Sequence, residues 1–365
     1  MNADKSLVID ADAHVVECAR TWEFMDPSEQ RYRPIALETR EEAGVRLQFW
    51  VIDGKVKGFR FPAFSSEQLE KLSQQVGRKF ADAQEARELG NVDLRLEHMD
   101  ETGVDVQVLH NTMFIESATD RAAVEVALCK SWNRWLADIW KQGQGRLRWS
   151  CMAPTLSMPD ALDQIRWSRE NGACAVLLRP IEGQRLLADP YFYPVYEEAQ
   201  KRDLAIAIHI ANGNAWLTDL YNHPVRIAST FHRFRIPTVA AFSDILLSDI
   251  HETFPRLRFG FIEASAQWVP WVLHEARSRF RTLGREWPDN LLREYGMYIT
   301  CENSDDLPYI VREAGEDNLV IGTDYGHTDT SSDVDAIRIF RDRSDLPGAV
   351  KQKILSDNAR ALYAM

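Results

Sequence analysis

The stretch LAIAIHI, residues 204–210, is an almost continuous apolar run that reaches a histidine near its end. FGFIEA at 259–264 and NLVIGTD at 318–324 have the same form, with Glu263 and Asp324 at the polar end. Strands of a parallel sheet that is covered on both faces are typically apolar throughout rather than alternating. The three runs therefore predict parallel strands, each with an ionisable residue where the strand ends.

Similar runs recur along the chain, separated by segments with helical periodicity such as Arg121–Trp140 and Pro159–Asn171. We predict eight strands, at Leu7–His14, Val104–His110, Arg146–Pro154, Ala173–Arg179, Leu204–His209, Arg258–Glu263, Met297–Glu302 and Leu319–Asp324. Eight strand–helix units predict an α/β fold, a (β/α)8 TIM barrel, with residues 1–365 forming a single domain.

Two segments interrupt the alternation. An insertion from about Pro27 to Asn91 follows the first strand; within it VRLQFWVIDGKVKGFRF, residues 45–61, predicts a hairpin with its turn at Asp53-Gly54, followed by a polar helix. A long connection, Ala211 to Thr253, follows the fifth strand. Loops after the strands build the active site of such barrels, so we expect both segments to shape or cover it.

Composition narrows the class of protein. Lys plus Arg total 43 against 55 for Asp plus Glu, and a net charge of −12 argues against binding to nucleic acid or an anionic membrane. No apolar run approaches the roughly 18 residues of a membrane span, and the amino terminus does not resemble a signal peptide, so we expect a soluble, cytoplasmic protein. The five cysteines show no C-x-x-C pairing, and we expect reduced, structural thiols.

Ionisable residues lie at almost every predicted strand end, namely Asp12, His14, His110, Arg179, His209, Glu263, Glu302 and Asp324. The carboxyl ends of barrel strands meet at one face, so these side chains should converge. Asp12 and His14 are two residues apart and point to the same face of their strand. With His209 and Asp324 they offer four N/O donors for one divalent metal, although a core histidine and a turn-capping aspartate are the alternatives.

Four motifs, IDADAH at 9–14, the strand-five histidine, GTDYGH at 322–327 and ILSDNARALY at 354–363, resemble the amidohydrolase-related family that includes aminocarboxymuconate-semialdehyde decarboxylase. RLEHMDETGVDVQVL at 95–109 resembles that family's stretch before its second strand. The resemblance implies that the metal ligands are the four residues Asp12, His14, His209 and Asp324. It also implies a small-molecule substrate and a homodimer. Zn is the first expectation for this donor set, with Mn and Fe(II) as alternatives.

One departure bears on the reaction. The family's decarboxylases show Gly-His, then Gly-Glu, at strand six, whereas GFIEASAQW at 260–268 has Glu263 and no histidine. We therefore expect hydrolysis rather than decarboxylation, with Glu263 as a further metal ligand or proton carrier. A helix-capping role for Glu263 is the alternative.

The expected mechanism is attack by metal-activated water, with Asp324 accepting the proton. His232 and His223 are candidates for proton transfer or for contact with an oxyanion, or else surface histidines. Arg179 would hold a substrate carboxylate unless it forms a structural ion pair, and His327 would orient the site or contact the substrate.

The expected substrate is a hydrophobic or aromatic carboxylate, cleaved at an amide, ester, thioester or C–C bond beside a carbonyl. Tryptophans in or near the predicted loops, Trp22, Trp50, Trp216 and Trp268, are consistent with an apolar substrate. Non-oxidative decarboxylation of an aromatic or unsaturated acid is the second hypothesis. A binding protein that has lost its chemistry is the third.

Overall fold

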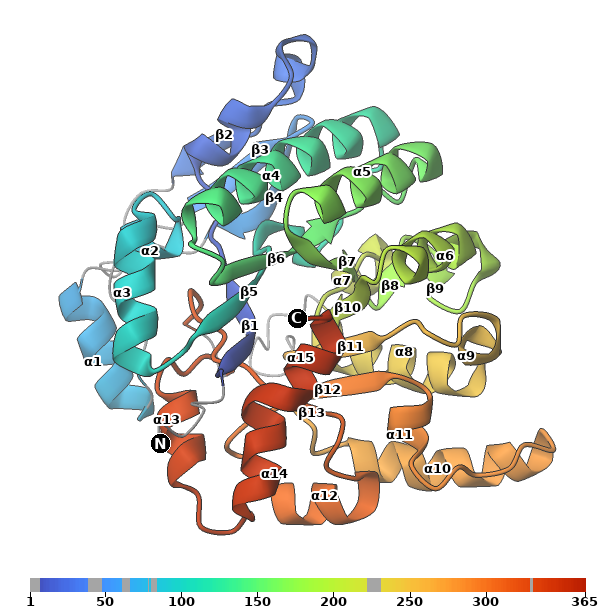
Figure 1. The fold of residues 1–365 in the computed structure, drawn as a ribbon. Helices are drawn as coiled ribbons and strands as arrows, with labels where there is room; N and C mark the ends of the chain where they lie inside the picture. The colour runs from blue at the N-terminus through green and yellow to red at the C-terminus, as the bar shows by residue number, and fades with distance from the viewer. Residues whose placement is uncertain are drawn as a thin grey trace.

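The computed structural model describes residues 7–38, 48–60, 66–77, 79, 84–221, 231–328 and 331–365. At its centre, eight parallel strands form a nearly closed barrel with helices between them (Figure 1). Their order is β1 (Ile9–His14), β5 (Val106–His110), β6 (Leu147–Met152), β7 (Ala173–Leu178), β10 (Ala205–His209), β11 (Phe259–Ile262), β12 (Met297–Cys301) and β13 (Leu319–Ile321). The predicted barrel and all eight predicted strands are confirmed.

Strands β1 and β13 approach each other where the barrel closes. Asp324 N donates to Asp12 O (2.9 Å), and His14 N donates to Tyr325 O (2.8 Å). This approach requires glycine at 322, because a Cβ built there would lie 2.2 Å from Asp12 Cβ. The closure brings the first and last strands of the barrel together and places Asp12 and His14 beside Asp324.

Helices cover the outside of the barrel and bury their apolar faces against it. They are α2 (Gln84–Arg87), α3 (Val92–Thr102), α4 (Ala122–Gln142), α5 (Met158–Glu170), α6 (Tyr193–Lys201), α8 (Ile236–Leu247), α9 (Ile250–Thr253), α10 (Val269–Thr282), α11 (Leu291–Glu294), α12 (Leu307–Ala314), α13 (Ala336–Asp342), α14 (Gly348–Gln352) and α15 (Asn358–Tyr363). Helix α15 belongs to the core: Tyr363 is fully buried and its hydroxyl donates to Ala11 O (3.0 Å).

The insertion after β1 contains a three-stranded antiparallel sheet of β2 (Ile35–Glu38), β3 (Gln48–Ile52) and β4 (Lys55–Arg60), followed by helix α1 (Ser66–Val76). Asp53 and Gly54 form the predicted turn with φ of 52° and 75°. Strand β2 was not predicted, and residues 45–47 and 61 of the quoted hairpin segment lie outside the described residues. Trp50 of β3 packs edge-on against Trp22 in the core, with ring centroids 5.7 Å apart.

The long connection after β10 contains α7 (Ala215–Tyr221), a π-helical turn at Phe231–Arg235, and then α8 and α9. Among the described ranges, no helix has both the length and the apolar character needed to cross a bilayer. All five cysteines are free and buried. Burial raises the pKa of the Cys174 thiol to about 11, which disfavours the reactive thiolate there.

Candidate metal centre

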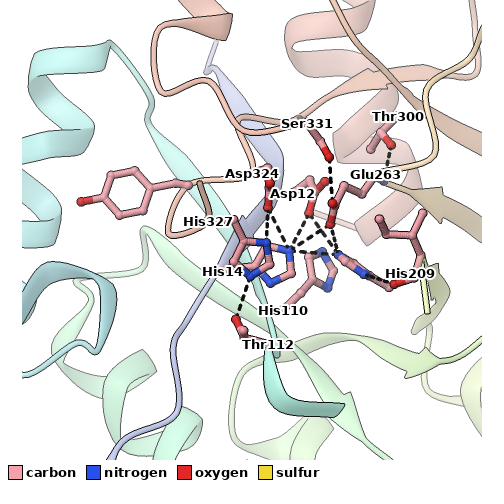
Figure 2. A network of polar contacts seen from close by, with 12 residues as sticks. Asp12, His14, His110, Thr112, His209, Glu263, Thr300, Asp324, His327 and Ser331 are labelled. Atoms are coloured by element: carbon pink, nitrogen blue, oxygen red, sulfur yellow. Dashed lines mark hydrogen bonds and ion pairs between the residues drawn. The ribbon is translucent and has the colours of Figure 1, made fainter. Parts of the chain in front are cut away.

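Four of the predicted ligands meet at the carboxyl ends of the strands (Figure 2). Asp12 and His14 project from β1, His209 ends β10 and Asp324 follows β13; all four are at most 3% exposed. His14 Nε2 lies 3.4 Å from Asp12 Oδ1, 3.0 Å from His209 Nε2 and 3.3 Å from Asp324 Oδ1. The structure therefore brings these four side chains together around one point.

The two histidines are oriented by backbone carbonyls. His14 Nδ1 donates to Asn111 O (2.8 Å), and His209 Nδ1 donates to Ile210 O (3.1 Å). A carbonyl can only accept, so each Nδ1 carries a hydrogen and each Nε2 faces the carboxylates. Metal-binding histidines are typically fixed in this way by a partner on the other ring nitrogen.

Glu263 belongs to the same cluster. Its Oε2 lies 3.5 Å from His14 Nε2 and 3.2 Å from His209 Nε2, and the residue is 4% exposed. The backbone N–H of Glu263 donates to Thr300 Oγ1 (2.6 Å), and Ser331 Oγ donates to Glu263 Oε1 (2.9 Å). Glu263 and Asp324 both adopt left-handed backbone conformations, with φ of 63° and 50°.

Among the described residues, ligand-type atoms form two overlapping groups of four, each with its atoms within 4.8 Å of one another. One contains Asp12, His14, His209 and Glu263; the other contains His14, Glu263, Asp324 and His327. His14 and Glu263 are common to both. Glu263 is therefore as central as the four ligands predicted first, and His327 joins the cluster through Asp324.

His327 is held between Asp324 and Thr112. Its Nδ1 lies 2.8 Å from Asp324 Oδ1, and its Nε2 lies 2.9 Å from Thr112 Oγ1. Thr112 Oγ1 donates to Val15 O (2.8 Å), so it accepts from Nε2–H of His327 and leaves Nδ1 of a neutral ring facing Asp324. Burial and the neighbouring His14 and His209 lower the pKa of His327 well below its usual range.

Asp10, on β1, links this strand to β5 and to the segment after β13. It accepts from Thr323 N (2.9 Å), Thr323 Oγ1 (2.6 Å) and Gln107 Nε2 (3.0 Å), and burial raises its pKa to about 6. His110 ends β5 but contacts Ser150 Oγ (3.0 Å) and Ala11 O (3.2 Å), and burial lowers its pKa to about 3. These residues support the donor groups without belonging to them.

The donor set fits a cation. Burial opposes ionisation of Asp12, but contact with His14 and His209 holds its pKa well below the usual range. Although burial alone lowers the pKa of His14, contact with the carboxylates of Asp12 and Glu263 raises it to about 10. The carboxylates thus favour positive charge at Nε2 of His14, and three buried carboxylates with two imidazoles suit a divalent metal ion.

Arg179 does not lie in these donor groups. Its Nε and Nη2 donate to Glu182 Oε2, its backbone N donates to Glu182 Oε1 (2.9 Å), and Nη1 donates to Phe114 O (3.3 Å). This is the ion pair considered as the alternative for Arg179. The pairing with Glu182 compensates the charge that was expected to hold a substrate carboxylate.

The connection after β10 is anchored on two loops. Arg233 Nη2 binds Glu116 Oε1 after β5 (2.7 Å), and Arg235 Nη2 binds Glu302 Oε1 after β12 (2.7 Å). His232, between the two arginines, is exposed and stacks on Tyr221, so the structure does not bring it to the buried donors. His223 lies outside the described residues.

The amidohydrolase family model matches residues 9–365, from the start of β1 onward. The chain belongs to the amidohydrolase family. The resemblance drawn from the sequence motifs is thereby confirmed. Among solved structures, this amidohydrolase is similar to an amidohydrolase from Mycobacterium avium subsp. paratuberculosis K-10, with a TM-score of 0.80, 18% identity and coverage of 100% of this chain and 99% of that one.

Two further neighbours catalyse different reactions. One is 5-carboxyvanillate decarboxylase from Novosphingobium aromaticivorans, complexed with manganese and 4-hydroxy-3-methoxy-5-nitrobenzoic acid (TM-score 0.68, 15% identity, 99% and 97% coverage). The other is 4-oxalomesaconate hydratase from Rhodopseudomonas palustris (TM-score 0.61, 16% identity, 98% and 96% coverage). At these identities the likeness to this amidohydrolase concerns the fold, and the reaction has to be argued from the site.

Removal of metal by a chelator is expected to destabilise the protein, because Asp12, Glu263 and Asp324 then lose their common counter-ion. At a metal concentration of about 100 Kd, the free energy of unfolding should fall by about 2.7 kcal/mol on chelation. Thermal unfolding with and without chelator measures this change. His209→Ala should show little response to the chelator, and an unchanged wild-type midpoint would contradict the metal assignment.

Proposed function

We propose that this amidohydrolase is a metal-dependent hydrolase that cleaves a bond beside an uncharged carbonyl group. The observation that carries the proposal is the position of Glu263, whose Oε2 lies between 3.2 and 3.5 Å from both histidine Nε2 atoms. Asp12, Glu263 and Asp324 together bring three negative charges, and a divalent ion leaves the centre with a net charge of about −1. A carboxylate bound directly to the metal would add to this charge, whereas a neutral ester, thioester, amide or diketone carbonyl does not.

The metal would be held by Asp12, His14, His209, Glu263 and Asp324. A divalent cation in this donor set supplies Lewis acidity, which polarises a carbonyl and makes a water molecule more acidic. Five donors with three carboxylates suit an ion that accepts five or six ligands, so Mn²⁺ and Fe²⁺ fit better than the Zn²⁺ first expected. Metal quantification on protein purified without added metal distinguishes them.

Asp324 and His327 provide the route for the proton. Water forms the new bond to the carbonyl carbon, and Asp324 takes up its proton at Oδ1. His327 Nδ1, 2.8 Å away, shares that proton, because Thr112 fixes the ring with Nδ1 as an acceptor. The proton then passes to the leaving group as the old bond breaks.

Isotope labelling distinguishes hydrolysis from decarboxylation. The metal-loaded protein is incubated in H₂¹⁸O with neutral esters, thioesters, amides and diketones, and in parallel with aromatic carboxylates. We expect ¹⁸O in a product carboxylate and about 100-fold slower turnover for Glu263→Gln. Glu302→Gln is the matched control, since Glu302 also follows a strand but pairs with Arg235. Release of CO₂ from the acids, without label in the product, would indicate decarboxylation instead.

A further inference from the structure

A cavity of about 740 Å³ lies on the same face of the barrel as the metal centre but has its own lining. It is bordered by the loops after β5, β6, β7 and β10 and by the β3–β4 turn, and its lining includes none of the residues of the two donor groups. Gly213 lines it and donates to Ile181 O (2.9 Å), while the neighbouring Asn212 N donates to Ile115 O (2.7 Å). Hydrogen bonds between these loops hold the walls in place.

Most charged groups in this wall have an opposite charge beside them. The pairs are Asp53 with Arg121 (2.5 Å), Lys55 with Asp120 (3.9 Å), Arg185 with Asp189 (3.1 Å) and Arg179 with Glu182. Glu125 has to share its cation. Arg179 Nη2 lies 3.9 Å from Glu125 Oε1 and also binds Glu182, so one guanidinium faces two carboxylates and this part of the wall keeps an excess negative charge.

One carboxylate oxygen of Glu125 can accept a hydrogen bond from a cation in the cavity. Glu125 lies in the first turn of α4, its side chain is 10% exposed, and its Oε2 accepts from Leu156 N (2.7 Å). Within the described ranges, no hydrogen bond is donated to Oε1. Burial raises the pKa of Glu125 to about 7 although Arg179 opposes the shift. A buried carboxylate with an available oxygen at a cavity is stabilised by a positively charged hydrogen-bond donor.

Aromatic side chains complete the wall. Phe192 is buried, Tyr191 donates its hydroxyl to Thr155 O (2.6 Å), and Trp216 is 69% exposed at the rim. Aromatic faces attract cations as well as apolar groups. We propose that this cavity binds an organic ammonium ion with an apolar or aromatic body, the ammonium group pairing with Glu125 and the body lying against Trp216. This site is separate from the metal centre and does not depend on the proposed hydrolysis.

Titration calorimetry of the full chain with benzylammonium and benzyl alcohol tests the site. The wild type should bind benzylammonium at least about tenfold more tightly than the alcohol, and Glu125→Gln should lose this preference. Asp120→Asn is the matched control, since Asp120 lines the same cavity but is 81% exposed and pairs with Lys55, and it should keep the preference. Equal affinity of the wild type for the two probes, or an unchanged preference in Glu125→Gln, would overturn the proposal.

Two further measurements keep the test independent of folding and of the metal. Because Trp216 is exposed, Trp216→Ala should fold normally and bind benzylammonium about fivefold more weakly; unchanged affinity counts against the site. Chelation of the metal should leave binding unchanged, even if no hydrolysis is ever found. Loss of benzylammonium binding on chelation would place the amine on the metal and refute the separate site.

Discussion

Replacing His14 by alanine is expected to weaken metal binding about a thousandfold, or by about 4 kcal/mol. His14 is common to both donor groups, and its Nε2 lies within 3.5 Å of donor atoms from Asp12, His209, Glu263 and Asp324. The substitution removes one ligand and also leaves the neighbouring carboxylates without an imidazole between them. Metal content of the purified protein and competition with a chromophoric chelator measure the loss.

His110→Gln is the matched control for this variant. His110 ends the neighbouring strand β5, and its ring centroid is 6.0 Å from that of His14, but its nitrogens contact Ser150 and Ala11. We expect its metal affinity to change by less than about threefold. Stoichiometric metal in His14→Ala, or equal losses in the two variants, would show that the donor groups are wrongly assigned.

Gly322→Ala is expected to destabilise the barrel by about 4 kcal/mol or more, because the clash is between two Cβ atoms, whose positions the backbone fixes and no rotamer change can relieve. The added Cβ would lie 2.2 Å from Asp12 Cβ and 3.1 Å from Asp12 N. Separation of β13 from β1 would break the hydrogen bonds Asp324 N to Asp12 O and His14 N to Tyr325 O. The variant should therefore lose metal as well as stability.

Urea unfolding of Gly322→Ala beside Gly348→Ala tests this prediction. Gly348 begins α14, and a Cβ there would meet no atom within 4 Å, so alanine should be neutral or stabilise the helix by up to about 1 kcal/mol. An unchanged urea midpoint for Gly322→Ala would contradict the prediction, since it would mean that the barrel accommodates a Cβ at position 322 beside Asp12.

The barrel could be predicted because its strands are buried on both faces and so form continuous apolar runs. The predicted strands extend one to three residues beyond those observed at the ends of β11 and β13. Glu263 accounts for the difference at β11, because its left-handed backbone directly follows Ile262, the last residue of that strand. Strand β13 ends at Ile321, before Asp324 turns left-handed. Strand β2 was missed because four residues at the edge of a small sheet carry little pattern.

The convergence of Asp12, His14, His209 and Asp324 could be predicted from their strand-end positions, whereas the residues that contact them could not. Thr112 contacts His327 across 215 positions of sequence, which leaves no local signal. Arg179 is different: its partner Glu182 is only three residues away, and that spacing could have indicated the ion pair. The placement of His232 depends on Arg233 and Arg235 pairing with acids on two separate loops, which composition alone does not reveal.

The closure of the barrel has a consequence for the order of folding. Thr323 and Asp10, 313 positions apart, share a hydrogen bond, and Tyr363 reaches Ala11 across 352 positions. Contacts of such large sequence separation carry a high loop-closure cost and form slowly. A chain folded only through β12 lacks Asp324, so tight metal uptake should report that β1 and the segment after β13 have met.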